Sequence, residues 1–229
     1  MKLKILFLFL FLITNKYIFC EYYYESDYDI LMEHLNINRS NDIIKLFEDG
    51  ISRYETGKDM ITRETGLKIT ISTLKRIGEL NININNRIKD IIKRYMPFRK
   101  IEESKANSIY LFNMALWTYL KLGNDNEIKY ILNFILPNII NNPKYVETLT
   151  FIIRGLGEAK DSKIALDYLH KLLIETDNEI IGTEIVNSIV KHKKTISIAF
   201  LLDKKKTLTL KFSPKFIKLI DESIEEIGK

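Results

Sequence analysis

Residues 126–192 read NEIKYILNFILPNIINNPKYVETLTFIIRGLGEAKDSKIALDYLHKLLIETDNEIIGTEIVNSIVKH, and this stretch decides the fold. Its apolar residues recur at spacings of three and four, which is the pattern of helices with one apolar face. The first two faces consist of Ile128, Ile131, Leu132, Ile135 and Leu136, and of Val146, Leu149, Ile152, Ile153 and Leu156. Between them, Asn142 can cap the second helix and Pro143 suits its first position. Gly157 stands where a left-handed residue commonly ends a helix.

The same plan follows immediately downstream and is echoed upstream. Asp161 or Ser162 can cap a third helix, and Asp177 or Asn178 a fourth. Upstream, Asn86, Ile88, Lys89, Ile91 and Pro97 recur at a constant offset of 40 as Asn126, Ile128, Lys129, Ile131 and Pro137. This repetition predicts an all-α fold, a short α solenoid of about four helical hairpins with a C-terminal capping helix.

Residues 86–192 resemble the HEAT repeat family, including its subtype related to phycobilisome lyases. The resemblance is carried by a proline late in a first helix, a turn of Asn or Asp, and a second helix that closes on Leu-Gly. It implies that the second helices line a concave inner surface. Glu147 and Gly182 stand where the turn of the family usually carries arginine, and tetratricopeptide-like pairing is the alternative. Both alternatives give a helical solenoid.

The first 20 residues are predicted to direct export, and a spacer follows them. In residues 1–20, two lysines precede an apolar run that is too short for a membrane span, which is the layout of a secretory signal peptide. Cys20, the only cysteine, is either the lipid-accepting residue of a lipoprotein or a small residue at the cleavage point. Residues 21–29, EYYYESDYD, are interpreted as an acidic, tyrosine-rich spacer.

The repeats are predicted to occupy residues 30–192, and residues 193–229 a C-terminal capping segment. The repeat region begins with a short helix over Ile30, Leu31 and Leu35, followed by a helical pair that runs to Ile77. Gly66 and the β-branched run at 69–73 disfavour the second of these helices. In the capping segment, residues 207–212 alternate between polar and apolar as a short strand or extended arm does, and Pro214 opens a final helix.

The candidate binding residues follow from the least polar helix, ANSIYLFNMALWTYLKLG at 106–123. This helix is expected to be central and covered on two faces. Aligning Leu122 with Leu156 places its Trp117 over Phe151, so that both aromatics would face the inner surface. The candidate partner-binding residues are Asn113, Trp117, Lys121, Glu147, Phe151 and Arg154. The competing interpretation is that a terminal segment folds back over them.

The charge balance argues against nucleic-acid binding. The formal charge of the chain is +5, and loss of residues 1–20 removes three lysines and no acid, which leaves +2. No concentrated basic face of the kind that displaces counterions is evident. Lysine clusters at 191–194 and 204–206 could touch anionic lipid, but such runs are more often solvated turns. Contact with a membrane is therefore expected only through a lipid anchor or this weak basic patch.

Catalytic, metal-binding and cofactor-binding residues are not predicted. The three histidines, His34, His170 and His192, lack the spacing of a helical metal pair. The sequence contains no phosphate-binding loop and no nucleophile elbow. The paired His-Glu motifs of iron enzymes with HEAT repeats are also missing, as is a cysteine after position 20 that could hold a bilin pigment.

The sequence therefore favours an exported, non-catalytic scaffold that binds a protein or peptide partner. Its expected location is the periplasm or cell envelope, with attachment to the membrane if Cys20 carries lipid. The alternatives are a structural envelope protein whose solenoid ends stack on other subunits, and a tetratricopeptide-like adaptor. An enzyme or cofactor carrier is the least favoured class.

Overall fold

A computed structural model of the protein describes residues 39–96 and 106–229. Every regular element within these two ranges is helical, so the predicted all-α fold is confirmed. The predicted signal peptide, the spacer, Cys20 and the short helix over Ile30 to Leu35 lie outside the described residues. The chain divides into two compact units, Met1–Ile77 and Gly78–Lys229.

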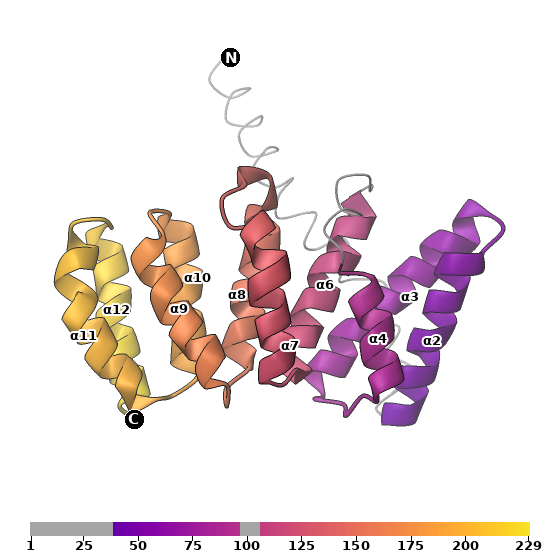
Figure 1. The fold of residues 1–229 in the computed structure, drawn as a ribbon, viewed down its shortest axis with the longest axis horizontal. Helices are drawn as coiled ribbons and strands as arrows, with labels where there is room; N and C mark the ends of the chain where they lie inside the picture. The colour runs from indigo at the N-terminus through magenta and orange to yellow at the C-terminus, as the bar shows by residue number, and fades with distance from the viewer. Residues whose placement is uncertain (1–38, 97–105) are drawn as a thin grey trace, which may run out of the picture. The chain divides into compact units, whose positions relative to one another are not determined.

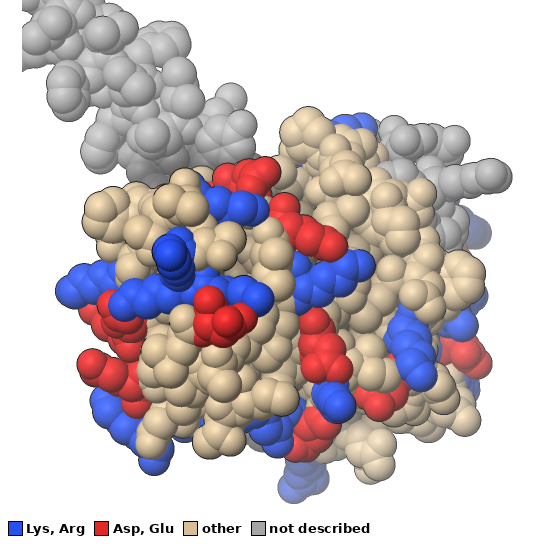
Figure 2. Space-filling view, turned by 60° about the vertical axis from the view of Figure 1, so that its left-hand side comes forward, with Lys and Arg blue, Asp and Glu red and all other residues tan. Residues whose placement is uncertain are grey.

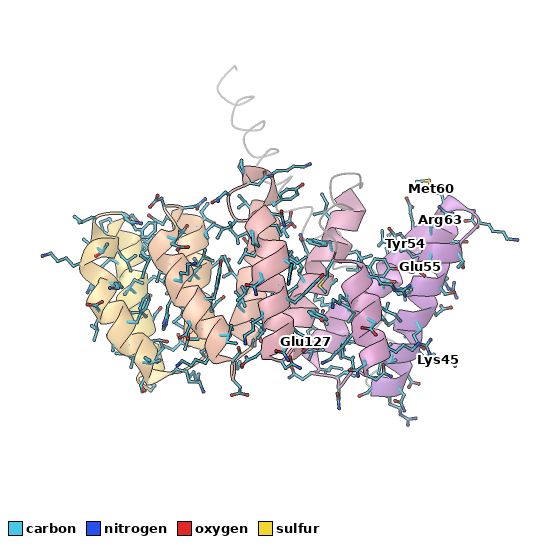
Figure 3. All side chains as sticks on the ribbon, in the orientation of Figure 1. Lys45, Tyr54, Glu55, Met60, Arg63 and Glu127 are labelled. Atoms are coloured by element: carbon cyan, nitrogen blue, oxygen red, sulfur yellow. The ribbon has the colours of Figure 1, made fainter. Side chains whose placement is uncertain are left out.

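The described part of the first unit is a helical hairpin. Helix α2 (Ser40–Thr56) turns at Gly57 into α3 (Met60–Glu79), which ends just beyond the boundary between the units. Arg63 Nε donates a hydrogen bond of 2.6 Å to the Gly57 carbonyl and so closes the turn. Figure 3 shows this end of the hairpin with Tyr54, Glu55, Met60 and Arg63.

Helix α3 forms in spite of Gly66 and the β-branched run because α2 packs closely against it. A Cβ atom at Gly66 would lie 2.4 Å from the Tyr54 backbone nitrogen, and one at Gly50 would lie 2.8 Å from Thr70 Oγ1. The Thr70 hydroxyl donates to the Gly66 carbonyl at 2.8 Å, so it remains satisfied inside the helix. Close helix packing therefore outweighs the weak helix propensity of this segment.

The second unit is built from helical hairpins stacked side by side (Figure 1). Its helices are α4 (Asn86–Arg94), α6 (Ala106–Leu122), α7 (Asp125–Tyr130), α8 (Val146–Glu158), α9 (Lys163–Glu175), α10 (Glu179–Lys191), α11 (Thr195–Thr209) and α12 (Pro214–Ile227). The second helices α6, α8, α10 and α12 contact one another in this order and form one layer. The first helices α7, α9 and α11 also contact one another in order, and form the other layer. This is the two-layer plan of an α solenoid.

The C-terminal segment is a further helical hairpin of the stack. Residues 207–212, predicted as a strand or extended arm, instead belong to the end of α11 and the turn into α12. Leu201 and Leu208, seven residues apart on α11, are both buried. Packing on one helical face thus overrides the local alternation of polar and apolar residues.

Most helix starts lie where the sequence predicts them. Asn142 accepts a hydrogen bond from the Lys144 N–H, in a short 3₁₀ turn (Pro143–Tyr145) that leads into α8. Ser162 caps α9 and Asn178 caps α10, each through its side-chain oxygen. These caps are local interactions between neighbours in the sequence, which is why the sequence predicts them well.

Gly157 does not end its helix as predicted. Helix α8 continues through it to Glu158, and no described glycine has a positive φ angle. A Cβ atom at Gly157 would lie 2.7 Å from the Ser188 Cβ of α10. The glycine is needed for the close approach of two helices and not for a left-handed conformation.

The first helix of the same hairpin is irregular. Helix α7 passes into a π-helical turn (Ile131–Ile135) and then a 3₁₀ turn (Leu136–Asn138), where one helix was predicted to continue. Pro137 explains the change, because it lacks an N–H donor and its ring crowds the carbonyl four residues earlier. The predicted apolar face persists through the irregular turns, since all of its members are buried.

Candidate functional site

Two of the predicted partner-binding residues are buried. Asn113 on α6 has no exposed surface, and Phe151 on α8 is only 9% exposed. The Phe151 ring meets the ring of Tyr110 edge-on, with the centroids 6.0 Å apart. The prediction that these two side chains face a partner is therefore wrong. Both belong to the packed interior, which agrees with the general tendency of large aromatics to be buried.

The contacts of Gly155 show how α8 packs against α6, which the repeat alignment of Trp117 with Phe151 does not reveal. A Cβ atom at Gly155 would lie 2.9 Å from Leu120 Cβ and 3.4 Å from Trp117 Cα. The backbone of α8 thus approaches α6 closely at Gly155, which lies against Leu120 and Trp117. A repeat alignment based on the Leu-Gly pairs misses this close approach, because it carries no information on helix separation.

Trp117 is half-buried, and its ring is flanked by a glycine and a lysine. A Cβ atom at Gly78 would lie 2.4 Å from Trp117 Cζ3, so the indole fills the space that a side chain there would need. The Lys121 ammonium lies 5.1 Å from the centroid of the ring, a cation–π distance. Glu147 is exposed in the first turn of α8.

Lys121 belongs to a row of alternating charges that crosses three second helices. Its Nζ lies 3.3 Å from one carboxylate oxygen of Glu158 on α8, and Lys191 Nζ on α10 lies 2.6 Å from the other. We call Lys121, Glu158 and Lys191 the charge row. Arg154 forms a separate two-pronged pair with Glu184 on α10, with both contacts at 3.1 Å. Two of the predicted binding residues, Lys121 and Arg154, therefore also join the repeats to one another.

The charge row determines the ionisation of Glu158. Burial raises the pKa of its carboxyl, but the hydrogen bonds and charges of Lys191 and Lys121 outweigh burial and hold the pKa below its usual value of 4.5. The carboxylate is therefore stabilised in the folded protein relative to the unfolded chain. The resulting stability is fully present above pH 4.5 and is lost as the pH falls through the folded-state pKa.

We expect Glu158→Gln to lower the free energy of unfolding at pH 7 by about 1–2 kcal/mol, between the values typical of exposed and buried ion pairs. The difference from the unmodified protein should shrink as the pH falls below 4.5. Urea denaturation at several pH values measures both effects. Glu222→Gln is the matched control, because it removes the exposed pair of Glu222 with Lys218 within α12. An equal loss in both variants would show that the charge row has no special role.

His192 joins two hairpins in a way that the sequence does not reveal. The ring is buried, with Nε2 3.0 Å from the Leu156 carbonyl and Nδ1 3.2 Å from the Lys160 carbonyl. Burial lowers the pKa of His192 below its ordinary value, although both carbonyls favour the protonated ring. The neutral ring can donate to only one of the two carbonyls at a time. The sequence gives no sign of these contacts, because both carbonyls belong to the end of α8 and the turn that follows it, more than 30 residues earlier.

An open cleft of about 680 Å³ lies between two adjacent hairpins of the second unit. One wall comes from the turn before α8 and the first turns of that helix, and the other from the end of α9 and the start of α10. Leu149, Leu172 and Ile181 give it a buried apolar floor. The rim is polar and consists of Asn141, Asn142, Glu175, Thr176, Asp177 and Asn178. An apolar cavity with a few polar groups in its lining is typical of a site that binds a ligand or a peptide.

The sequence contains a signal for this cleft in two asparagines, which are predicted above only as helix caps. Asn142 and Asn178 occupy equivalent turns of successive hairpins: Asn142 caps the 3₁₀ turn that leads into α8, and Asn178 caps α10. Each cap fixes a turn, and two neighbouring turns enclose the cleft. The predicted binding residues Trp117, Lys121 and Arg154 do not line it.

The described residues bring together two groups with possible chemistry. His170 Nε2 lies 3.1 Å from Ser197 Oγ, but Ser197 is fully buried and the His170 ring is stacked on Phe200. A substrate therefore cannot reach this hydroxyl in the observed conformation. Across residues 39–96 and 106–229, no three His, Cys, Asp or Glu side chains gather closely enough to hold a metal ion.

The surface near the C-terminal hairpin carries mixed charges. Figure 2, which brings the α11 and α12 end forward, shows basic and acidic side chains interspersed. Within the second lysine cluster, Lys204 pairs with Asp203 at 2.7 Å and Lys205 with Asp221 at 2.5 Å. In the part of the chain that the structure describes, none of the helices combines the length and hydrophobicity needed to span a membrane.

Comparison of the chain with protein-family models, with curated proteins and with solved structures gives no match.

Proposed function

We propose that this chain is an exported, non-catalytic helical-repeat scaffold that binds a protein or peptide partner in the cell envelope. The observation that carries the proposal is the open cleft between the α7–α8 and α9–α10 hairpins, with its apolar floor and polar rim. Stacked helical hairpins commonly present such surfaces to extended partners. Export rests on the pattern of residues 1–20, and an N-terminus at Glu21 in protein isolated from its own cells would support it.

Site-specific photo-crosslinking in the native cells tests the proposed binding. A benzoylphenylalanine at Val146, which lines the cleft, should link the protein to one dominant partner. The matched control is the same residue at Phe134, an exposed aromatic on the π-helical turn that does not line the cleft. Links from position 146 that are missing at position 134 support the proposal. The absence of links at position 146, or the same links at both positions, would count against it.

A further inference from the structure

The floor of the cleft is suited to aliphatic side chains. Leu149, Leu172 and Ile181 come from three different helices and converge on the same cavity. Ile140 and Val146 extend this lining towards solvent. Such walls gain free energy from burying an aliphatic group, at about 25 cal/mol per Å² of apolar area removed from water.

The polar rim of the cleft includes two charged side chains, each of which pairs with a lysine outside the lining. Among the described residues that line it, the charged ones are Glu175 and Asp177, both carboxylates. Asp177 is paired with Lys211 at 2.9 Å although its side chain is 85% exposed, and Glu175 lies 3.7 Å from Lys171. Exposed pairs of this kind contribute about 0–1 kcal/mol, so a basic group of a partner can compete for these carboxylates.

The side-chain oxygens of two rim asparagines bond to the protein itself. The side-chain oxygen of Asn142 accepts from the Lys144 N–H, and that of Asn178 accepts from the N–H groups of Ile180 and Ile181. These bonds hold both turns in place. The rim is therefore a fixed frame around the apolar floor, and its charge comes from the two carboxylates.

Exposed apolar residues continue from the cleft along the edge where the hairpins turn. Ile174 and Ile180 flank the α9–α10 turn, and Ile180 is 73% exposed. Leu210, 86% exposed, lies in the next turn, and its neighbour Lys211 donates a hydrogen bond of 2.9 Å to the Ile174 carbonyl. Figure 1 shows the turns into α8, α10 and α12 on the same edge of the second unit. Apolar side chains clustered beside a cleft indicate an interaction surface.

We infer that this cleft recognises a peptide segment in which an aliphatic side chain stands next to a lysine or arginine. The aliphatic side chain occupies the floor, and the basic group pairs with Glu175 and Asp177 at the rim. The inference rests on the proposed function, since it names the class of partner for the same cleft. Charge complementarity with the two carboxylates is what distinguishes a basic segment from an acidic or neutral one.

Selection of a random peptide library displayed on phage against the purified protein tests this inference. We expect enrichment of peptides with an aliphatic residue beside Lys or Arg. In the double variant Glu175→Lys, Asp177→Lys, binding of these peptides should fall about tenfold or more, and the selected sequences should shift to acidic neighbours. Asp167→Lys is the matched control, because it adds a lysine at an exposed position of α9 outside the cleft and should leave the selection unchanged.

A second variant separates failure of this inference from failure of the proposed function. Val146→Asp places a charge in the cleft lining at a position that is already partly exposed, so the fold should be retained. Enriched peptides of another class that lose binding in Val146→Asp would overturn the basic–aliphatic assignment and leave the scaffold function standing. Peptides that bind the Glu175→Lys, Asp177→Lys variant and the Val146→Asp variant with the affinity they have for the unmodified protein would overturn the assignment of the cleft itself. If no peptide is enriched and photo-crosslinking at position 146 also fails, both proposals fall.

Discussion

Replacing Gly157 with leucine should destabilise the protein by about 3 kcal/mol or more, because α8 and α10 leave no room for a side chain. A Cβ atom there would lie 2.7 Å from Ser188 Cβ and 2.9 Å from Ser188 Cα. Rotation of the serine side chain cannot relieve these contacts, so the helices must move apart. Urea denaturation followed by circular dichroism measures the loss. Gly228→Leu is the matched control, since the nearest atom to a Cβ there is 3.4 Å away.

A smaller substitution at Gly157, combined with one at the facing Ser188, distinguishes a clash between the two helices from a change in helix propensity. Gly157→Ala should cost less than Gly157→Leu, because alanine adds one carbon and favours the helix by about 1 kcal/mol over glycine. Adding Ser188→Gly to Gly157→Ala removes the clashing Cβ and Oγ atoms and should restore part of the stability. A double-mutant cycle gives the coupling between the two sites. Simple additivity would contradict the proposed contact.

Replacing Asn113 with leucine should raise the free energy of unfolding by about 1–3 kcal/mol, the cost of a buried polar group without a partner. Among the described residues, neither the amide nitrogen nor the amide oxygen of Asn113 has a hydrogen-bond partner, and the side chain has no exposed surface. Leucine has a similar size and needs no hydrogen bond. Asn113→Asp should have the opposite effect, because an ionised carboxylate would lie unpaired in the interior. Thermal and urea denaturation check both directions.

The control for Asn113 is a buried polar group that does have a partner. Ser223 on α12 is buried, and its hydroxyl donates to the Leu219 carbonyl at 2.7 Å. Ser223→Ala should therefore bring no gain in stability. If Asn113→Leu destabilises the protein by as much as Asn113→Asp does, the amide is satisfied in solution and burying it carries no such cost.

The features that the sequence predicts correctly are local ones. Ser162 and Asn178 cap helices through hydrogen bonds to residues two or three positions away, so the sequence alone contains both partners. The apolar stripes of α7 and α9 are predicted for the same reason, since helical periodicity determines which residues share a face. These local signals are sufficient to predict an all-helical fold with repeated hairpins.

The features that the sequence does not predict depend on how neighbouring helices approach one another. Helix α6 is apolar on most sides, so its periodicity does not show that Asn113 faces inward. Gly155 allows α8 to lie close to Leu120 and Trp117 of α6, and this close approach is a tertiary property that the sequence pattern does not contain. The sequence does not predict the cleft either, because its walls come from turns of two different hairpins. Export and the lipidation of Cys20 stay predictions, as they concern residues outside the described ranges.

The charge row also restricts how this chain could have been assembled from its parts. A glutamate on α8 stands between lysines on α6 and α10, so each of these helices carries the sign that its neighbours require. Duplicating the α9–α10 hairpin would place two lysines side by side, and exchanging it with the hairpin before it would break the alternation in the same way. The charge row therefore favours the natural order of these units over a shuffled one. A shuffled or extended array would lose these two ion pairs unless the sign at one position of each misplaced unit were reversed.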